Sequence, residues 1–533
     1  MSFHGNTQIP TPNIDAIGAD GAYLNNYYVQ PVCSPTRTTL LTGRSVIRTG
    51  VYDPNLEGNS ADLSLNFTLL PQYLKQVGYD THMVGKWHLG ESSFKFTPLG
   101  RGFDTYSIGY LGGAEDYFRH GNQDVLDFWN GTSFTYEYSC QDADQCPLEK
   151  YSARIFTDAA IKILEKYQTN SKNDIEKKNN EAPFFLYLPM QSVHAPLEAP
   201  QDYIDSFNSS VSNPKRRIFA AMVKLLDESV GIVSKALSDF GLEENTIVIF
   251  STDNGGPADF FNKNMASNWP LRGMKRTLFE GGVRGVGAIK GPGIKHKGAW
   301  LDGLVHVADF LPSLLAHVSS NKNIKKTFGI DLLPGDGMDV WDYLSGQNDT
   351  SPRKYILHEA HPHGSKDGNG AALRVGDYKI VLRSGSSWST GCKIGSNDGW
   401  YGGEGSSDPH HEGAYSLPSG KVTQPYTVKC PPPPKDLKRG FACEQGSLGE
   451  QSIQHACLFN IKTDPCEHHD LSQEPEHKAT LKSLWAELGK FREIAVDSRI
   501  NRSPDGPNCP KFVKCEGPQC NGMSGAHVPC NMP

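Results

Sequence analysis

The sequence contains no long hydrophobic run and no excess of positive charge. A transmembrane helix needs about 20 consecutive apolar residues, and no such run occurs among the 533 residues, of which 37% are hydrophobic. Lys and Arg number 52 against 59 Asp and Glu, which gives a net charge of −7. Proteins that coat nucleic acid or an anionic membrane are usually strongly basic. We therefore expect a globular protein with neither nucleic acid nor a membrane among its partners.

Cysteine is scarce before residue 392, where only Cys33, Cys140 and Cys146 occur. The other nine of the 12 cysteines lie between Cys392 and Cys530, in a stretch rich in Pro and Gly. Disulfides would supply the order that such a stretch cannot obtain from a core, and they persist in oxidising compartments. With Cys33 set aside an odd number of cysteines remains, and we expect Cys140 and Cys146, close together in a loop, to pair.

Glycosylation signals point to the same kind of compartment. Five Asn-X-Ser/Thr triplets are present, at Asn66, Asn130, Asn208, Asn348 and Asn501. They are glycan acceptors only in a chain that follows the secretory route. The first residues show no charged and then apolar leader. We therefore expect a lysosomal or secreted glycoprotein whose signal peptide precedes Met1.

Helix and strand signals alternate over about the first 330 residues, which is typical of a doubly wound α/β sheet flanked by helices. Helices are predicted over Asn66 to Val77 and over Asn213 to Phe240. Strands are predicted over Tyr79 to Val84, Phe184 to Pro189 and Asn245 to Phe250. Polar residues follow each of these strands. Because ligands bind beyond the carboxyl ends of the strands in such sheets, we expect the functional site there.

The pattern changes in the second part of the chain. A strand is predicted over Leu373 to Leu382 and a late helix over Leu481 to Val496, with the Cys-rich stretch between them. We therefore expect an α/β domain over 1–350 and a smaller, Cys-rich α+β domain over 351–533. The charged, aperiodic segment Asn170 to Asn180 is expected to be an exposed loop.

The strongest motif is Cys33-Ser34-Pro35-Thr36-Arg37. A helix predicted after Pro35 would begin at Cys33, so free backbone N–H groups and the positive end of the helix dipole would point at that side chain. Arg37 lies one helical turn further on and can return to the same end of the helix. This arrangement favours an anion-binding site at Cys33.

Together with further segments, this motif resembles the type I sulfatases. The segments are Asn25-Asn26-Tyr27-Tyr28, Gly85-Lys86-Trp87-His88-Leu89-Gly90, Gln191-Ser192-Val193-His194-Ala195-Pro196, Ser251-Thr252-Asp253-Asn254-Gly255-Gly256, Trp269-Pro270-Leu271-Arg272-Gly273-Met274-Lys275 and Leu458-Phe459-Asn460-Ile461. Trp269 to Gly287 is most similar to the arylsulfatase B branch, the N-acetylgalactosamine-4-sulfatases. The resemblance implies an alkaline-phosphatase-like α/β fold and hydrolysis of sulfate esters in glycosaminoglycans.

The resemblance also implies a covalent mechanism centred on Cys33. In the family a formylglycine-generating enzyme oxidises this cysteine to formylglycine, and one hydroxyl of the hydrated aldehyde attacks sulfur. The other hydroxyl later collapses and expels sulfate. Arg37 is expected to fix the hydrate, Lys86 to contact the sulfate, and His88 to orient or deprotonate a hydroxyl. Lys86 and His88 alternate along a segment expected to be extended, so their side chains should point the same way.

His194 and Lys275 resemble the pair that binds a sulfate oxygen and protonates the leaving alcohol. A lysine in a dry pocket beside a dication has a lowered pKa, which suits a proton donor. From the residues alone, Arg276 would be equally qualified, and only the family motif selects Lys275.

The adjacent oxygen donors Asp253 and Asn254 favour a hard cation, and the family binds calcium there together with the Cys33-derived hydrate. The family completes this site with two adjacent aspartates on the first strand. The first aspartate in this chain is Asp15, in a segment that matches a later part of the family pattern. We therefore expect that Met1 to Gly5 begins just after a missing strand that carries these two aspartates.

Two other histidine groups invite a metal interpretation. They are His358-Glu359-Ala360-His361-Pro362-His363 and His410-His411. Neither has the H-E-x-x-H spacing of a helical zinc site, and Pro362 interrupts the first. We expect solvated loop histidines, which could border the substrate cleft.

Two alternative functions remain open at this point. A phosphate-ester hydrolase of the same superfamily would need Ser or Thr as nucleophile, and Ser34 stands one position out of register. A catalytically inactive protein that binds sulfated glycans through Arg37, Lys86 and Lys275 would explain the absent aspartates. The main hypothesis is a calcium-dependent sulfatase acting on the 4-position of sulfated N-acetylgalactosamine.

Overall fold

The structure is a computed structural model of the chain. It describes residues 1–382 apart from 7, 55–61, 114, 123–124, 141–145, 169–181, 259–263, 320–322 and 363–369. Beyond these it describes residues 415–416, 422–423, 426, 428–431, 452–498, 511–514 and 525–528.

The first large sheet has the strand order β10-β11-β1-β12. Its strands are β10 (Val248–Ser251), β11 (Gly287–Lys290), β1 (Ala22–Leu24) and β12 (Ala299–Leu301). β11 is antiparallel to both β10 and β1, whereas β1 and β12 are parallel. β10 ends two residues before Asp253, so this sheet delivers the expected metal ligands.

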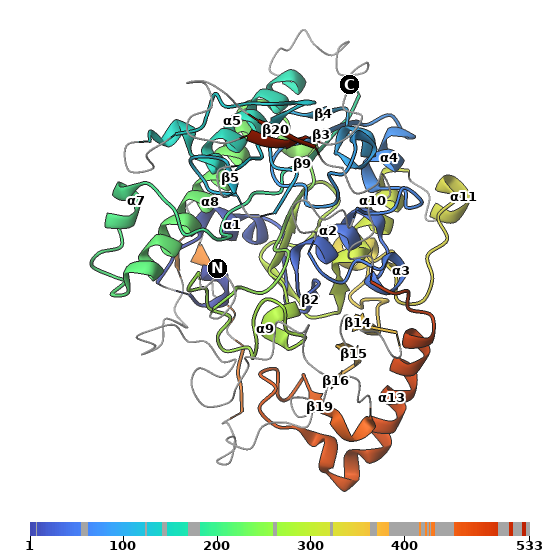
Figure 1. Ribbon diagram of the computed structural model, residues 1–533. Coiled ribbons are helices and arrows are strands. Elements are labelled where there is room, and N and C mark those ends of the chain that lie inside the picture. Colours follow the sequence, from blue (N-terminus) through green and yellow to red (C-terminus); the bar gives the residue numbers. More distant parts are fainter. Residues whose placement is uncertain are drawn as a thin grey trace.

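Helices cover both faces of this sheet (Figure 1). Tyr23 of β1 points to one face, where it packs with α1 (Pro12–Ala19) and α8 (Pro214–Asp239). Its neighbours Ala22 and Leu24 point to the other face, against α10 (Phe310–Val318) and α12 (Trp341–Leu344). The period-2 alternation of a strand thus builds a helix–sheet–helix arrangement, as the sequence predicted.

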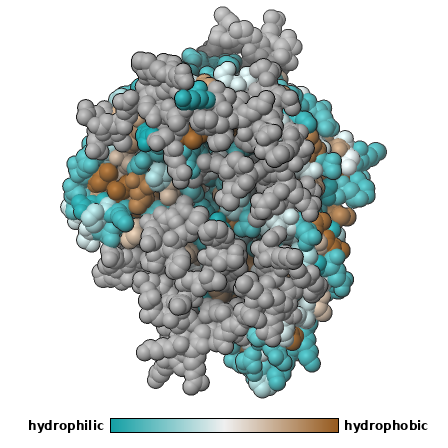
Figure 2. All heavy atoms as spheres, in the orientation of Figure 1, coloured by the Kyte–Doolittle hydropathy of each residue, from teal (hydrophilic) through white to brown (hydrophobic). Residues whose placement is uncertain are grey.

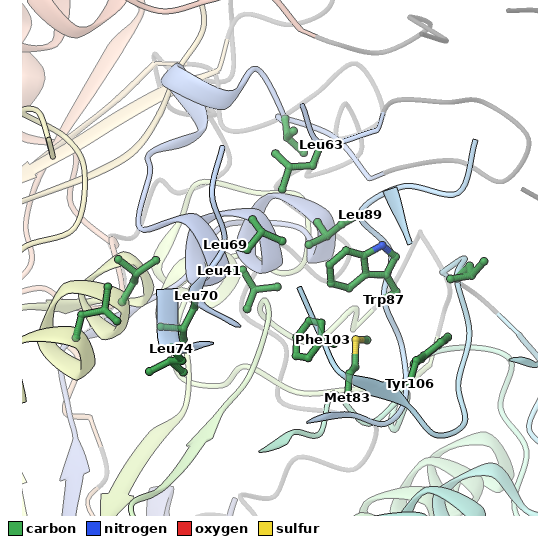
Figure 3. Close-up of a cluster of buried hydrophobic side chains, with 14 of the residues drawn as sticks. Leu41, Leu63, Leu69, Leu70, Leu74, Met83, Trp87, Leu89, Phe103 and Tyr106 are labelled. Atoms are coloured by element: carbon green, nitrogen blue, oxygen red, sulfur yellow. The ribbon is translucent and has the colours of Figure 1, made fainter. Parts of the chain in front are cut away.

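A second, parallel sheet carries the next part of the site, in the order β4-β3-β9. Its strands are β4 (Thr105–Tyr106), β3 (Asp80–Met83) and β9 (Phe184–Tyr187). One face packs on α2 (Cys33–Thr42), α4 (Leu70–Lys75) and α10. Figure 3 shows that core, in which Leu41, Leu70 and Leu74 face Met83 and Trp87. α5 (Ser152–Leu164) covers the other face.

A separate antiparallel sheet lies beside these layers, in the order β14-β15-β16-β19. Its strands are β14 (Tyr355–Ala360), β15 (Ala371–Val375), β16 (Tyr378–Leu382) and β19 (Ala456–Asn460). α13 (Lys478–Glu493) packs against it and lies at the lower right edge of the molecule in Figure 1. The division at residue 351 stays a prediction.

The remaining short elements connect these layers. They are β2 (Tyr27–Tyr28), β13 (Val305–His306), β5 (Gly121–Asn122), β6 (Val125–Leu126), β7 (Trp129–Asn130), β8 (Ser133–Phe134), β17 (Tyr415–Ser416), β18 (Val422–Thr423), β20 (Lys511–Lys514), β21 (Gly525–Val528), α3 (Val46–Thr49), α7 (Gln201–Asp205), α9 (Glu280–Val283) and α11 (Ile324–Phe328). β21 pairs in parallel with β6, so the end of the chain returns to the part of the molecule near α5 (Figure 1).

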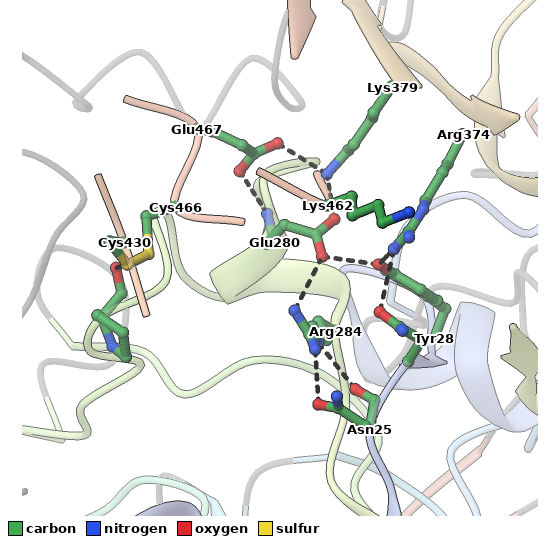
Figure 4. A network of polar contacts seen from close by, with 12 residues as sticks. Asn25, Tyr28, Glu280, Arg284, Arg374, Lys379, Cys430, Lys462, Cys466 and Glu467 are labelled. Atoms are coloured by element: carbon green, nitrogen blue, oxygen red, sulfur yellow. Dashed lines mark hydrogen bonds and ion pairs between the residues drawn. A yellow bond between two sulfur atoms is a disulfide. The ribbon is translucent and has the colours of Figure 1, made fainter. Parts of the chain in front are cut away.

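A buried polar network joins the antiparallel sheet to the first part of the chain (Figure 4). Nζ of Lys379 lies 2.9 Å from a carboxylate oxygen of Glu280 and 2.9 Å from one of Glu467, and all three side chains are fully buried. Tyr28 donates its hydroxyl to Glu280 at 2.7 Å and receives a hydrogen bond from Arg374. Burial raises the pKa of Glu467 to about 7, and the nearby Glu280 charge adds to the effect while Lys379 opposes it.

Two expectations about local structure were wrong. The helix predicted from Asn66 begins only at Leu70, because Pro71 has no N–H to donate and suits the first helical turn. The strand predicted over Leu373 to Leu382 is two strands, β15 and β16. They are joined at Gly376, whose φ of 55° permits the tight turn.

Other expectations are confirmed. α8 follows the predicted helix closely, with Asn213 as a side-chain N-cap that accepts from Arg216 N at 3.1 Å. Cys140 and Cys146 form a disulfide. The Cys-rich stretch contributes a second disulfide, Cys430–Cys466. The segment Asn170 to Asn180 lies outside the described residues.

The described surface is mainly hydrophilic. Figure 2 shows teal residues over most of the described part of one face, with smaller hydrophobic groups between them. Among the described helices, none is long and apolar enough to cross a membrane.

Candidate active site

Cys33 is the first residue of α2, and its thiol is free and buried, with 2% of the residue exposed. Val32 before it is extended, so the first backbone N–H groups of the helix face the same end as the thiol. Sγ of Cys33 lies 3.3 Å from Nδ1 of His88. The helix end and a ring nitrogen therefore meet at the predicted nucleophile.

Positive charge dominates the surroundings of Cys33. Burial by itself raises the pKa of the thiol, but the charges of Lys86, His88 and Lys275 outweigh it and hold the pKa well below its usual value. Burial lowers the pKa of Lys86 to about 8. Its Nζ donates to Gly113 O at 2.7 Å. The pocket is built to hold an anion at the position of Sγ.

The loop after β3 brings Lys86 and His88 to Cys33, but not as the extended segment that the sequence suggested. His88 has a φ of 60°, in the left-handed region. Its N–H donates to Leu111 O at 3.0 Å. A Cβ on Gly113 would stand 2.4 Å from Nε2 of His88, so only glycine fits there. The ring is held by the close approach of this second loop rather than by strand alternation.

Arg37 links the turn that carries Asp253 to the loop that carries Lys86. Its guanidinium donates to a carboxylate oxygen of Asp253 at 2.9 Å and to the backbone carbonyl of Lys86 at 2.9 Å. Burial raises the pKa of Asp253, but the charges of Arg37, Lys86 and Lys275 reverse this, and the net pKa is lowered. Asp253 is therefore a carboxylate at neutral pH.

His194 and Lys275 form a direct pair. Nζ of Lys275 lies 2.9 Å from Nε2 of His194, and Nδ1 of His194 lies 2.8 Å from Ala195 O. Nδ1 must donate to that carbonyl, which leaves Nε2 as the acceptor for Lys275. Burial, followed by the charges of Lys275 and Lys86, holds the pKa of His194 well below its usual value. Arg276 points elsewhere, with NH1 3.8 Å from Asp53.

Asp253 and Asn254 lie beyond the carboxyl end of β10 as predicted. Thr36 of α2 donates to Asp253 O at 2.5 Å, which ties the nucleophile helix to this turn. The Asp253 side chain is 33% exposed. Oδ1 of Asn254 is buried and has no hydrogen-bond partner among the described residues, while its Nδ2 donates to Gly255 O at 2.9 Å. This amide oxygen is therefore available to a ligand.

The predicted site residues thus meet at one edge of the two sheets. The sequence model of the Sulfatase family matches residues 1–320. The chain belongs to the sulfatase family. Members of this family are sulfuric ester hydrolases, and membership implies formylglycine and a divalent metal in general.

Several sulfatases resemble the chain over much of its length. Arylsulfatase J of Mus musculus is 33% identical over 506 residues, covering 94% of this chain and 74% of the relative. N-acetylgalactosamine-6-sulfatase of Homo sapiens is 29% identical over 346 residues, covering 63% of this chain and 62% of the relative. The crystal structure of Ps i-CgsB with k-i-k-neocarrahexaose has a TM-score of 0.66 at 23% identity, covering 95% of this chain and 92% of that one. The alkaline-phosphatase-like α/β fold is therefore confirmed.

The donors of this sulfatase fit a hard divalent cation in their chemistry. Asp253 supplies a carboxylate and Asn254 a buried amide oxygen without a partner, and both are ligand types that calcium and magnesium prefer. Calcium takes six to eight oxygen ligands, so these two donors would supply only part of a calcium coordination sphere. Among the described residues, the one group of acidic and histidine side chains close enough together to hold a metal ion is Glu474, Glu476 and His477, of which both glutamates are exposed.

The expectation of solvated loop histidines was wrong for His358 and His361. They are 0% and 3% exposed and lie at and just after β14. The ring of His358 packs edge-on against Tyr28 and that of His361 stacks on Tyr52, so the first part of the chain covers both. His363, His410 and His411 lie outside the described residues.

Sequence reasoning missed the residues that hold the site groups rather than perform chemistry. Thr36 inside the nucleophile motif, Gly113 beneath His88 and Asn268 beside Gly256 are the main ones. The Gly112-Gly113 pair and the position of Asn268 directly before Trp269 were the available signals. Neither indicates which distant loop the residue contacts.

Proposed function

We propose that this sulfatase hydrolyses sulfate esters of N-acetylgalactosamine in glycosaminoglycans. The observation that carries the proposal is the ring of basic groups around Cys33, formed by Lys86, His88 and Lys275. Such a ring suits a sulfate monoester, which carries its charge on the non-bridging oxygens. The name of the relative N-acetylgalactosamine-6-sulfatase supports the sugar. The arylsulfatase B-like segment from Trp269 to Gly287 favours the 4-position.

The nucleophile in this proposal is formylglycine made from Cys33 by a formylglycine-generating enzyme. One hydroxyl of its hydrate attacks sulfur, the S–O bond to the sugar breaks, and the sugar oxygen takes a proton. The second hydroxyl then loses its proton, and its oxygen becomes the aldehyde carbonyl. At the same time the bond between the carbon of residue 33 and the sulfate oxygen breaks, which releases sulfate. Water restores the hydrate. With a serine at position 33, which has only one hydroxyl, the reaction would stop at the sulfate ester of that residue.

The neighbours of Cys33 have separate tasks in these steps. His88, whose Nδ1 lies 3.3 Å from Sγ, takes the proton of the second hydroxyl. Lys86 binds a sulfate oxygen, and Arg37 orients the hydrate while its ion pair with Asp253 fixes its position. Each acts from a buried position, where a hydrogen bond or charge is screened less than in water.

The pair of Lys275 and His194 supplies the proton for the sugar oxygen. Because Nζ of Lys275 lies 2.9 Å from Nε2 of His194, both groups would contact the same sulfate oxygen, and Lys275 would give its proton to the leaving alcohol. Calcium would be held by Asp253, Asn254 and the oxygen of residue 33. When bound, it neutralises charge that develops on the sulfate oxygens.

The test is expression in secretory cells that contain the formylglycine-generating enzyme. Mass spectrometry of the Cys33 peptide should show that the thiol has been replaced by an aldehyde, with loss of the sulfur atom. The protein should hydrolyse an aryl sulfate and release sulfate from N-acetylgalactosamine sulfated at the 4-position faster than from N-acetylgalactosamine sulfated at the 6-position. A Cys33→Ala variant is the control and should turn over nothing.

Other outcomes of the same experiment identify the alternatives. An unmodified Cys33 with tight binding of sulfated glycans and no turnover would favour the inactive binding protein. Hydrolysis of phosphate esters in preference to sulfate esters would favour the phosphatase. Release of N-glycans by a glycosidase, and cell fractionation, test the proposed lysosomal or secreted location.

A further inference from the structure

Three loops that carry site residues converge on the short segment from Asn264 to Asn268. The first is the turn after β10 that contains Asp253 and Asn254. Oδ1 of Asn268 accepts from Gly256 N at 2.8 Å, and its Nδ2 donates to Gly256 O at 2.7 Å. One side-chain amide thus pairs with both backbone groups of a single residue, two positions after Asn254.

The same amide reaches a second loop. Nδ2 of Asn268 also donates to Gly273 O at 3.1 Å, two residues before Lys275. At the other end of the segment, Nδ2 of Asn264 donates to Val193 O at 2.9 Å, directly before His194. The segment therefore contacts the turn that carries the metal donors and both loops that carry the proton-donating pair.

The segment from Asn264 to Asn268 and the neighbouring loops are closely packed. A Cβ on Gly256 would stand 2.6 Å from Cβ of Ala266, and a Cβ on Gly255 would stand 1.8 Å from Gly281 O. The backbones approach this closely only because these positions are glycine. The Asn268 amide uses its acceptor and both of its N–H groups, so a flipped amide would place N–H against N–H.

We propose that Asn268 is a positioning residue that sets the distance between the Asp253–Asn254 turn and the Lys275 loop. This inference rests on the proposed function for what those two loops do. Asn268 itself touches neither substrate nor reacting atoms. It fixes the loop ends, so that the metal donors and the proton donor face the same sulfate group.

The experiment compares Asn268→Ala with Asn268→Asp. The first removes all three hydrogen bonds. The second keeps shape and the acceptor for Gly256 N but turns both carbonyl contacts into repulsions, so it tests the role even where the Ala variant is unstable. The matched control is Asn13→Ala, which removes the hydrogen bond of Asn13 Nδ2 to Asp227 at 2.8 Å, between α1 and α8.

Both Asn268 variants should bind calcium about 10–100-fold more weakly by calorimetry and lose a similar factor in kcat, with little change in KM for an aryl sulfate. Amide hydrogen exchange at Gly256 should accelerate in the Ala variant. The Asn13 control should match the wild type in all three measurements. Wild-type calcium affinity and wild-type kcat in both Asn268 variants would overturn the proposal.

Failure of the two proposals can be told apart. A wild-type protein that hydrolyses no sulfate ester overturns the proposed function. Calcium affinity and exchange at Gly256 still decide the role of Asn268 in that case, because neither measurement requires turnover.

Discussion

Nζ of Lys275 lies 2.9 Å from Nε2 of His194, although the two residues come from loops 81 positions apart in the sequence. The hydrogen bond from His194 Nδ1 to Ala195 O fixes which ring nitrogen accepts. In the proposed mechanism, Lys275 and His194 would therefore act together on one leaving-group oxygen.

We predict that Lys275→Ala and His194→Ala lower kcat/KM most for substrates with poor leaving groups. A sugar alcohol needs a proton as it departs, whereas an aryl oxygen needs it less. The expected loss is about 10²–10⁴-fold for a sulfated sugar and clearly smaller for a nitrophenyl sulfate. Equal losses on both substrates would show that the pair binds sulfate without donating a proton.

Asp253→Asn should weaken calcium binding and also lower stability. The change removes a negative charge from the metal donors and leaves the buried guanidinium of Arg37 without its 2.9 Å ion pair. Because the Asp253 side chain is 33% exposed, we expect a modest loss, about 1 kcal/mol in the free energy of unfolding. Calorimetry and urea unfolding measure the two effects. The control Asp239→Asn breaks the exposed pair with Lys235 and should change neither.

Gly113→Ala should inactivate the enzyme without unfolding it. The new Cβ would meet Nε2 of His88 at 2.4 Å, so the ring has to leave its observed position beside residue 33. We expect kcat to fall about 10²-fold, as for other groups that position a catalytic base. Gly489→Ala in α13, where nothing lies within 4 Å, is the control and should leave kcat unchanged. Unchanged activity in the Gly113 variant would mean that His88 is not needed in its observed place.

Glu467 should make the protein less stable as the pH rises from about 5 to 8. Its pKa is raised to about 7 in the folded state, from an ordinary value of 4.5. The folded state therefore holds a proton that the unfolded state has already lost, so stability decreases through this pH window. The contribution is about 1–3 kcal/mol, read as the change in Tm. Glu467→Gln should remove this dependence, whereas Glu493→Gln at the exposed end of α13 should not.

Periodicity predicted the long elements well, because their signal is local. α8 has one apolar face and an Asn-Pro start, and both of these belong to the segment itself. α4 and the β15–β16 hairpin were mispredicted at their ends, where one proline and one glycine decide the boundary. A hydrophobic pattern is judged over many residues, so a boundary that one proline or glycine decides is easily missed.

Motifs predicted the chemical groups of the site but not what holds them. Cys33, Lys86 and His194 could be placed because each sits in a distinctive segment. His358 gave no such signal, since its burial depends on Tyr28, more than 300 residues away. Contacts between distant loops are set by the fold as a whole, and a single sequence does not encode them in a readable pattern.

The burial of the Cys33 motif determines whether modification of Cys33 can follow folding. Cys33 is 2% exposed and Arg37 6%, and Pro35 is buried between them inside α2. An enzyme that has to read all three side chains cannot reach them once the helix is packed. If Cys33 is converted to formylglycine as proposed, the conversion would have to come before folding, on the newly made chain. A chain that folded first would then keep its thiol, and the active fraction would depend on the relative rates of oxidation and folding.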